Sequence, residues 1–275
     1  MANKTYVGNL GNVTYDDTKY QLVTDNEGEY FHYIGSDTTN IVPPKGLTNY
    51  TGLYMGTNIE EPVTIPEGVV STNGMYSGCQ NLVKGSVVPD TVKDMSFMYD
   101  GCKSLKTIPN FSNNATDLSC VCANCSNLES LPEIPGSARN CDSIALNCEK
   151  LTGPIVVNEG VYNLACGFAG CTSLDDKIDL PTSVKITTDM YANCTQFEVE
   201  DDELDDVTYD LSDDNALKHD DFVKHYNDLT NQQANAKATV ATKSNNLTSA
   251  EKQAMAAAVL GNNGVSLSNE MGMSK

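Results

Sequence analysis

The hydrophobic positions of this chain recur every 23 residues, with no insertion or deletion over six successive repeats. One column holds cysteine throughout: Cys79, Cys102, Cys125, Cys148, Cys171 and Cys194. A second column, three residues later, holds Leu82, Leu105, Leu128, Leu151 and Leu174, with Phe197 in the last place. A fixed period of this length is typical of solenoids, in which each repeat forms one coil and buries its apolar side against its neighbours. We therefore predict an α/β solenoid whose core is lined by these columns.

Each coil is expected to contain one strand and one short helical turn. We place the strand between the leucine column and the position six residues later, for example over 128–134. Side chains alternate along a strand, so Leu128 and Ile134 should face the core, with Glu129 and Glu133 in solvent. The helical turn is expected before the cysteine, for example over 94–99. Gly or Asn immediately precedes each cysteine and tolerates a positive φ, which predicts a recurrent left-handed turn.

The N-terminal 40 residues do not follow the repeat. Two segments of strand character, 19–24 and 29–34, flank a turn-forming stretch at 25–28. This hairpin would cover the open edge of the first coil. The repeat begins in degenerate form at residue 41, where Thr57 takes the place of the cysteine at an offset of 22 residues. We therefore expect about seven coils over 41–214.

The repeat decays towards its C-terminal end, where ten of the seventeen residues in 198–214 are acidic. Charged residues on a terminal strand block edge-to-edge growth, so this stretch predicts an acidic cap. A site for a hard cation such as Ca²⁺ is the alternative, although the spacing of an EF-hand loop is absent. The lysines and carboxylates expected to face solvent on the coils are mixed in sign: Lys84, Lys106, Glu129, Glu133, Asp175 and Lys177.

Residues 215–275 have the pattern of helices. A seam with the spacing of a coiled coil runs from 222 to 240, and a wholly apolar run follows at 255–260. Such a run needs a partner surface. We predict that this region attaches the solenoid to other proteins and makes the chain a homo-oligomer, through Phe222, Tyr226, Leu229, Ala236, Val240, Met255, Val259 and Leu260.

The charge balance argues against several classes of partner. The chain has 37 acidic and 17 basic side chains, a formal charge of −20, and Arg139 as its single arginine. Nucleic acids and anionic membranes are recognised by clustered Lys and Arg, so neither is an expected partner. The first residues lack the basic and apolar regions of a secretory signal, and no apolar run has the length of a membrane span. We expect synthesis in a cytosol.

The sequence predicts neither a cofactor nor catalysis. The ten cysteines mostly fall in repeat columns, which predicts reduced, buried thiols. The spacing Cys120-x-Cys122-x-x-Cys125 leaves zinc open as an alternative, although structural zinc usually takes four ligands. His32, His219 and His225 lie outside the cysteine repeats, so a thiol there has no histidine base within its own sequence region. No phosphate-binding or dinucleotide-binding loop is present.

The motif M-Y-x-G-C-x-x-L, found at 75–82 and 98–105, resembles the BspA-type leucine-rich repeat. An apolar residue and often a proline follow it. The resemblance covers about residues 41–211, and Met-Tyr is replaced at Val121-Cys122, Ile144-Ala145 and Gly167-Phe168. That family is a 23-residue variety known from bacterial surface proteins, some protists and phage-borne genes. The resemblance implies a stack of coils that serves binding.

The predicted role is therefore a non-enzymatic structural or adhesion protein. Exposure to surfaces outside a cell, without an export signal, favours a phage virion component such as a head fibre, a decoration protein or a tail-associated protein. Its expected partners are capsid or tail proteins and a host-surface ligand. An intracellular protein-protein interaction scaffold of cellular origin is the alternative, and a metal- or thiol-dependent enzyme is a third, more distant one.

Overall fold

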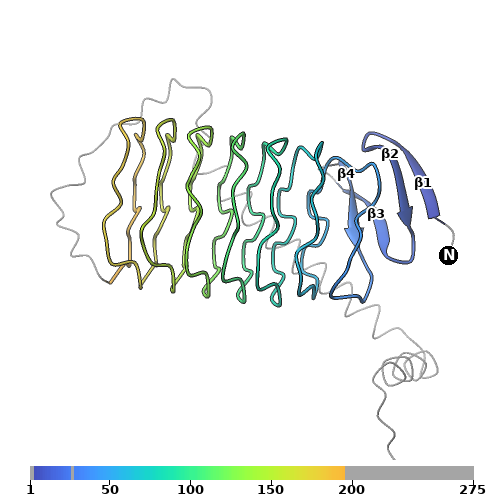
Figure 1. Cartoon of the computed structure of the whole chain (residues 1–275), viewed down its shortest axis with the longest axis horizontal. Helices are drawn as coiled ribbons and strands as arrows, with labels where there is room; N and C mark the ends of the chain where they lie inside the picture. Colours follow the sequence, from blue (N-terminus) through green and yellow to red (C-terminus); the bar gives the residue numbers. More distant parts are fainter. Residues whose placement is uncertain (1–2, 26–27, 196–275) are drawn as a thin grey trace, which may run out of the picture. The chain divides into compact units, whose positions relative to one another are not determined.

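The computed structural model describes residues 3–25 and 28–195, and these form two β-hairpins followed by a stack of coils (Figure 1). The first hairpin pairs β1 (Asn3–Gly8) with β2 (Gly11–Asp16), and the second pairs β3 (Tyr20–Asp25) with β4 (Gly28–Tyr33), both antiparallel. The second hairpin confirms the predicted one within a residue at each end. The first was not predicted, although Val13 and Tyr15 alternate with polar residues along β2.

The coils are joined by a parallel ladder in the segment before each cysteine. Single β-bridges connect one residue of each coil to the next, eight positions before the cysteine column: Asn49, Ser71, Asp94, Asp117, Asn140, Asn163 and Ile186. Every second amide then continues the ladder, as in the bonds from Phe97 N to Ser119 O (2.9 Å) and from Tyr99 N to Val121 O (2.8 Å). The predicted position of the strand was wrong: the segment after the leucine has only scattered bridges, such as Ile134 with Val157.

The segment expected to be a helical turn is a series of β-turns. Met98 N donates to Met95 O (3.1 Å), and Cys102 N donates to Tyr99 O (3.0 Å). The third residue of each turn has a positive φ, 57° at Phe97 and 69° at Gly101, as in type II turns. A helix is excluded here because alternate amides already donate to the neighbouring coil. The positive φ before each cysteine was predicted, whereas the one at the Phe97 position was not.

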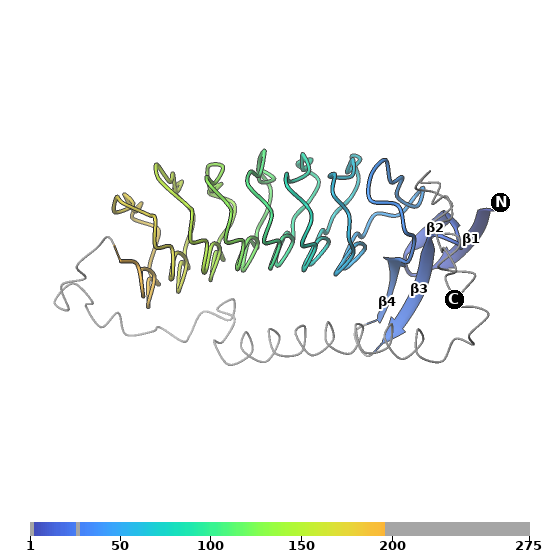
Figure 2. The ribbon, with the colours of Figure 1, turned by 90° about the horizontal axis from the view of Figure 1, so that it is seen from below.

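The predicted facing of the coil side chains is confirmed. Leu128 and Ile134 are fully buried, and Glu129 and Glu133 are exposed. The cysteine and leucine columns lie in one hydrophobic core that runs through the stack, and Figure 2 shows the coils side by side along it. Successive coils therefore bury their apolar columns against one another, as the periodicity requires.

A stack of tyrosines crosses the first coils. The rings of Tyr54, Tyr76 and Tyr99 lie parallel, with centroids 5.7 and 5.6 Å apart. Each hydroxyl of the last two accepts a hydrogen bond from the amide thirteen residues earlier, Val63 N to Tyr76 (2.9 Å) and Ser86 N to Tyr99 (3.0 Å).

This amide explains two departures from the Met-Tyr motif. In the next two coils the amide position is occupied by Pro109 and Pro132. Proline has no N–H to donate. Thirteen residues later stand Cys122 and Ala145, which carry no hydroxyl to accept. Phe168 keeps the ring without the hydroxyl, and the pairing returns where Ile178 N donates to Tyr191 (2.9 Å).

Candidate interaction surface

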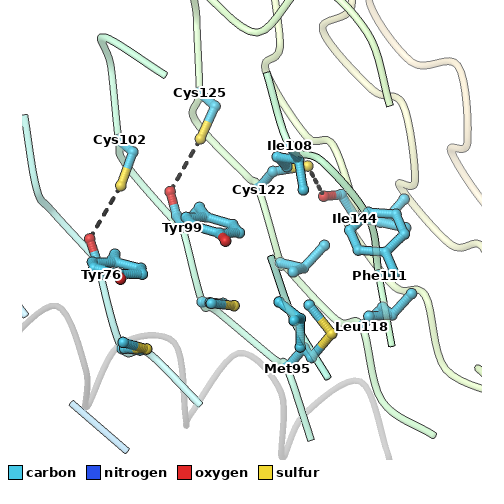
Figure 3. Packing of buried hydrophobic residues seen from close by; sticks show 14 of the residues in the cluster. Tyr76, Met95, Tyr99, Cys102, Ile108, Phe111, Leu118, Cys122, Cys125 and Ile144 are labelled. Carbon is cyan, nitrogen blue, oxygen red and sulfur yellow. Dashed lines mark hydrogen bonds between the residues drawn. The ribbon is translucent and has the colours of Figure 1, made fainter. Parts of the chain in front are cut away.

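The cysteine column is chemically quiet. Each thiol in it donates to a backbone carbonyl of the preceding coil, Cys102 Sγ to Tyr76 O (3.1 Å) and Cys125 Sγ to Tyr99 O (3.0 Å), as Figure 3 shows. Burial raises the pKa of both thiols well above the usual value. A thiolate is the nucleophile in cysteine chemistry, so these residues are held in their unreactive form.

The Cys120-x-Cys122-x-x-Cys125 spacing does not assemble a metal site. The thiols of Cys122 and Cys125 donate to different carbonyls, Ile144 O (2.8 Å) and Tyr99 O (3.0 Å). Cys120 is buried but stands apart from the hydrophobic core cluster. Over residues 3–25 and 28–195, no group of three or more His, Cys, Asp or Glu is arranged to hold a metal ion. All ten cysteines are free, and nine of them are buried.

His32 is a residue of the N-terminal cap. Its Nδ1 lies 3.1 Å from Gly52 O, and burial lowers its pKa. His219 and His225 lie outside the described residues, as do Phe197, the acidic stretch 198–214 and the predicted attachment residues Phe222, Tyr226, Leu229, Ala236, Val240, Met255, Val259 and Leu260. In the part of the chain that the structure does describe, no helix has the length and apolarity to cross a membrane.

One surface column combines positive charge with an aromatic ring. It stands one residue before the bridge ladder and consists of Val70, Lys93, Thr116, Arg139, Tyr162 and Lys185, which we call the basic column. Hydrogen bonds between coils join its backbone, for example Lys93 N to Val70 O (2.9 Å) and Lys185 N to Tyr162 O (2.9 Å). Neighbouring side chains therefore project about 4.8 Å apart, as on paired strands. All six are exposed except Tyr162, which is half-buried.

The three cations of the basic column are available to a ligand. Among the described residues, no carboxylate lies within ion-pair distance of Lys93, Arg139 or Lys185. The Arg139 guanidinium lies over the Tyr162 ring, 5.7 Å from its centroid. A cation held over an aromatic face in this way is partly ordered before any ligand binds. The cations alternate with Thr116 and Tyr162, so they recur about every 10 Å along the stack.

The basic column was missed when the sequence was analysed. The positions predicted to face solvent, Lys84, Lys106, Glu129, Glu133, Asp175 and Lys177, are all exposed, but they carry both signs of charge. The signal for the basic column was present as a 23-residue spacing from Lys93 to Lys185 that contains no acidic residue. It went unused because the strand had been placed in the other half of the coil.

Comparison with known proteins supports the architecture. No protein-family model and no curated protein matches the chain. Among solved structures, the leucine-rich repeat protein of T. pallidum superposes with a TM-score of 0.51 at 20% identity, over 70% of this chain and 94% of that one. A leucine-rich cell surface protein of Faecalibacterium prausnitzii A2-165 matches at 21% identity with a TM-score of 0.38, over 62% of this chain and 39% of its own. The first likeness shows the fold, a repeat solenoid of the leucine-rich kind.

Proposed function

We propose that the protein is a non-enzymatic adhesion protein of the BspA type that binds through the side of its solenoid. In this proposal it is a surface component of a phage virion, a head fibre, decoration or tail-associated protein, and it attaches to host or environmental surfaces. The sequence resemblance supports the BspA type and the virion setting. The name of the F. prausnitzii neighbour, a cell surface protein, is compatible with a role at surfaces.

The observation that carries the proposal is the contrast between buried and exposed columns. The buried columns repeat one residue type from coil to coil, as cysteine and leucine do. The basic column changes in every coil and still avoids acidic residues, on a chain of formal charge −20. A constant scaffold beneath a varied exposed row is the arrangement by which solenoids present extended binding surfaces.

The ligand class follows from the charge and spacing. Cations that recur about every 10 Å along a straight row match an extended polymer with regularly spaced anionic groups. The Arg139–Tyr162 pair at the centre adds a planar surface against which a sugar ring or another flat group can pack. We therefore infer an anionic polymer of a cell surface as the ligand. Residues 215–275 would attach the protein to capsid or tail proteins.

Charge reversal tests this assignment. Binding of the full chain to polygalacturonate and to poly-glutamate is compared with binding to neutral dextran. The triple variant Lys93→Glu, Arg139→Glu, Lys185→Glu should weaken binding to the anionic polymers at least tenfold. The matched control Lys103→Glu, Lys106→Glu, Lys150→Glu makes the same change in net charge at exposed positions of other columns. Equal losses in the two triples would reduce the effect to net charge and remove the basic column as the site.

A second candidate, an intracellular interaction scaffold of cellular origin, is favoured by the free thiols. Ten unpaired cysteines suit a protein that works in a reducing cytoplasm. The two proposals differ in where the chain is found. A virion component is present in a fixed number of copies in purified particles beside capsid or tail proteins, whereas a scaffold stays in the soluble fraction of the cell.

A further inference from the structure

Strand β1 is the outermost strand at the N-terminal end of the described residues (Figures 1 and 2). Its partner β2 is covered on both sides, by β1 and by an antiparallel bridge from Thr14 to Lys45. No strand of the described residues pairs with the outer side of β1. An edge of this kind presents a row of backbone donors and acceptors to any extended chain.

The bridge to Lys45 fixes which groups of β1 point outward. Thr14 N donates to Lys45 O and Lys45 N donates to Thr14 O, both at 2.9 Å, so both backbone groups of Thr14 point away from β1. Thr14 lies opposite Thr5, which makes them a non-hydrogen-bonded pair. The N–H and C=O groups of Thr5 therefore face the open edge. By the alternation of a strand, so do those of Asn3 and Val7.

The open edge lacks the features that normally prevent strands from pairing. It contains no proline, and the single charge of β1, on Lys4, forms an ion pair with Asp17 (2.5 Å). Val7 is 76% exposed. The opposite face of the strand is anchored, because the Tyr6 ring packs edge-on against Phe31 with centroids 5.8 Å apart. The edge is thus both held in place and unprotected.

We propose that β1 pairs antiparallel with β1 of a second copy of this chain, with Thr5 opposite the partner's Thr5. In this register all three outward-facing residues enter hydrogen-bonded pairs: Thr5 with its copy, and Asn3 with the partner's Val7 in both directions. Each such pair exchanges two bonds, so about six join the copies. The result is one continuous sheet of β2, β1 and their two counterparts.

The other two-fold registers are weaker. Centring the pairing on Lys4 leaves only two hydrogen-bonded pairs and sets the two lysines opposite one another, which is unfavourable for like charges. Centring it on Tyr6 also leaves two pairs, because the outward-facing groups of Asn3 then lie beyond the end of the partner strand. The Thr5 register also places Lys4 beside the partner's Tyr6, where its charge can lie against an aromatic ring.

Cysteine cross-linking of the full chain tests the register. Paired Cα atoms at a hydrogen-bonded position lie about 5.5 Å apart, within the range of a disulfide. Thr5→Cys should therefore give a covalent dimer on mild oxidation, seen on a non-reducing denaturing gel. Val7→Cys should not dimerise with itself, because its copy lies four residues away along the strand, about 14 Å. A mixture of Asn3→Cys and Val7→Cys should give the mixed dimer. Nine of the native cysteines are buried, which keeps the background low.

A proline variant tests the same contact without cross-linking. Because Thr5 makes no bond to β2, Thr5→Pro removes an outward donor and leaves the β1–β2 bonds in place. Light scattering should show that Thr5→Pro halves the mass of the assembly, whereas Thr5→Ala keeps it. The proposal is overturned if Thr5→Cys gives no covalent dimer, if Val7→Cys cross-links as well as Thr5→Cys, or if both Thr5 variants keep the wild-type mass.

Discussion

The hydroxyl of Tyr99 offers a sharp test of the tyrosine stack. Tyr99→Phe keeps the ring and its contact with Tyr76, whose centroid lies 5.6 Å away. The change removes only the acceptor of the Ser86 amide, which donates to the hydroxyl at 3.0 Å. Ser86 is 2% exposed, so water cannot replace the lost partner. A buried donor left without an acceptor costs about 1–3 kcal/mol of the free energy of unfolding.

Urea unfolding followed by circular dichroism measures this cost. With a slope of about 2 kcal/mol per molar urea, the midpoint should fall by about 0.5–1.5 M. The control is Tyr162→Phe, at a half-buried ring of the basic column, where the expected change is within about 0.5 kcal/mol. If Tyr99→Phe behaves like Tyr162→Phe, the hydroxyl does not satisfy the Ser86 amide, and the explanation of Pro109 and Pro132 fails with it.

Three further outcomes are expected. Leu128→Ala should lower the free energy of unfolding by about 2–5 kcal/mol and Glu129→Ala by under about 0.5 kcal/mol in the same urea assay, since the first is fully buried and the second exposed; equal effects would refute the facing. A thiol reagent followed by mass spectrometry should modify native protein first at Cys166, the one cysteine that is not buried, and rapid labelling elsewhere would contradict the packing. Burial raises the pKa of Asp100 to about 6, above the ~3.9 of an unfolded aspartate, so this carboxyl favours folding below about pH 4 and opposes it above about pH 6. Asp100→Asn should therefore raise the urea midpoint at pH 8 and leave it unchanged at pH 4, and an equal shift at both would exclude this titration.

The sequence was sufficient to predict what depends on periodicity. A column that repeats at 23 residues must occupy one place in every coil, so the burial of Leu128 and the exposure of Glu129 follow once the period is known. The location of the ladder does not follow in the same way. Apolar residues stand on both sides of each cysteine, and the alternation after Leu128 looked more strand-like than the turns around Phe97. The inter-coil bonds decide between them, and they are not visible in one chain's pattern.

The candidate surface was missed for a related reason. Lys93 and Arg139 differ in type, and a search for repeated residues finds the constant positions, which are structural. The exposed row became visible only when the ladder showed that these side chains project in parallel from adjacent coils. The first hairpin was missed because β1 carries only Tyr6 and Val7 as apolar residues, and a single buried ring is a weak signal for a strand.

The choice of cysteine in the repeat follows from two demands made at one position. The carbonyl of Tyr99 accepts two bonds, from Cys102 N (3.0 Å), which closes the turn, and from Cys125 Sγ (3.0 Å) of the next coil. The side chain that fills this position must be small and apolar enough to be fully buried, and it gains by donating one hydrogen bond. Valine meets the first demand alone, and serine meets the second at a larger desolvation cost. In the first coil the N-terminal hairpins precede the position, and there Thr57 turns its hydroxyl back to its own coil, to Tyr54 O (2.7 Å). The thiol column therefore reports contact between successive coils, which is why it begins only at the second.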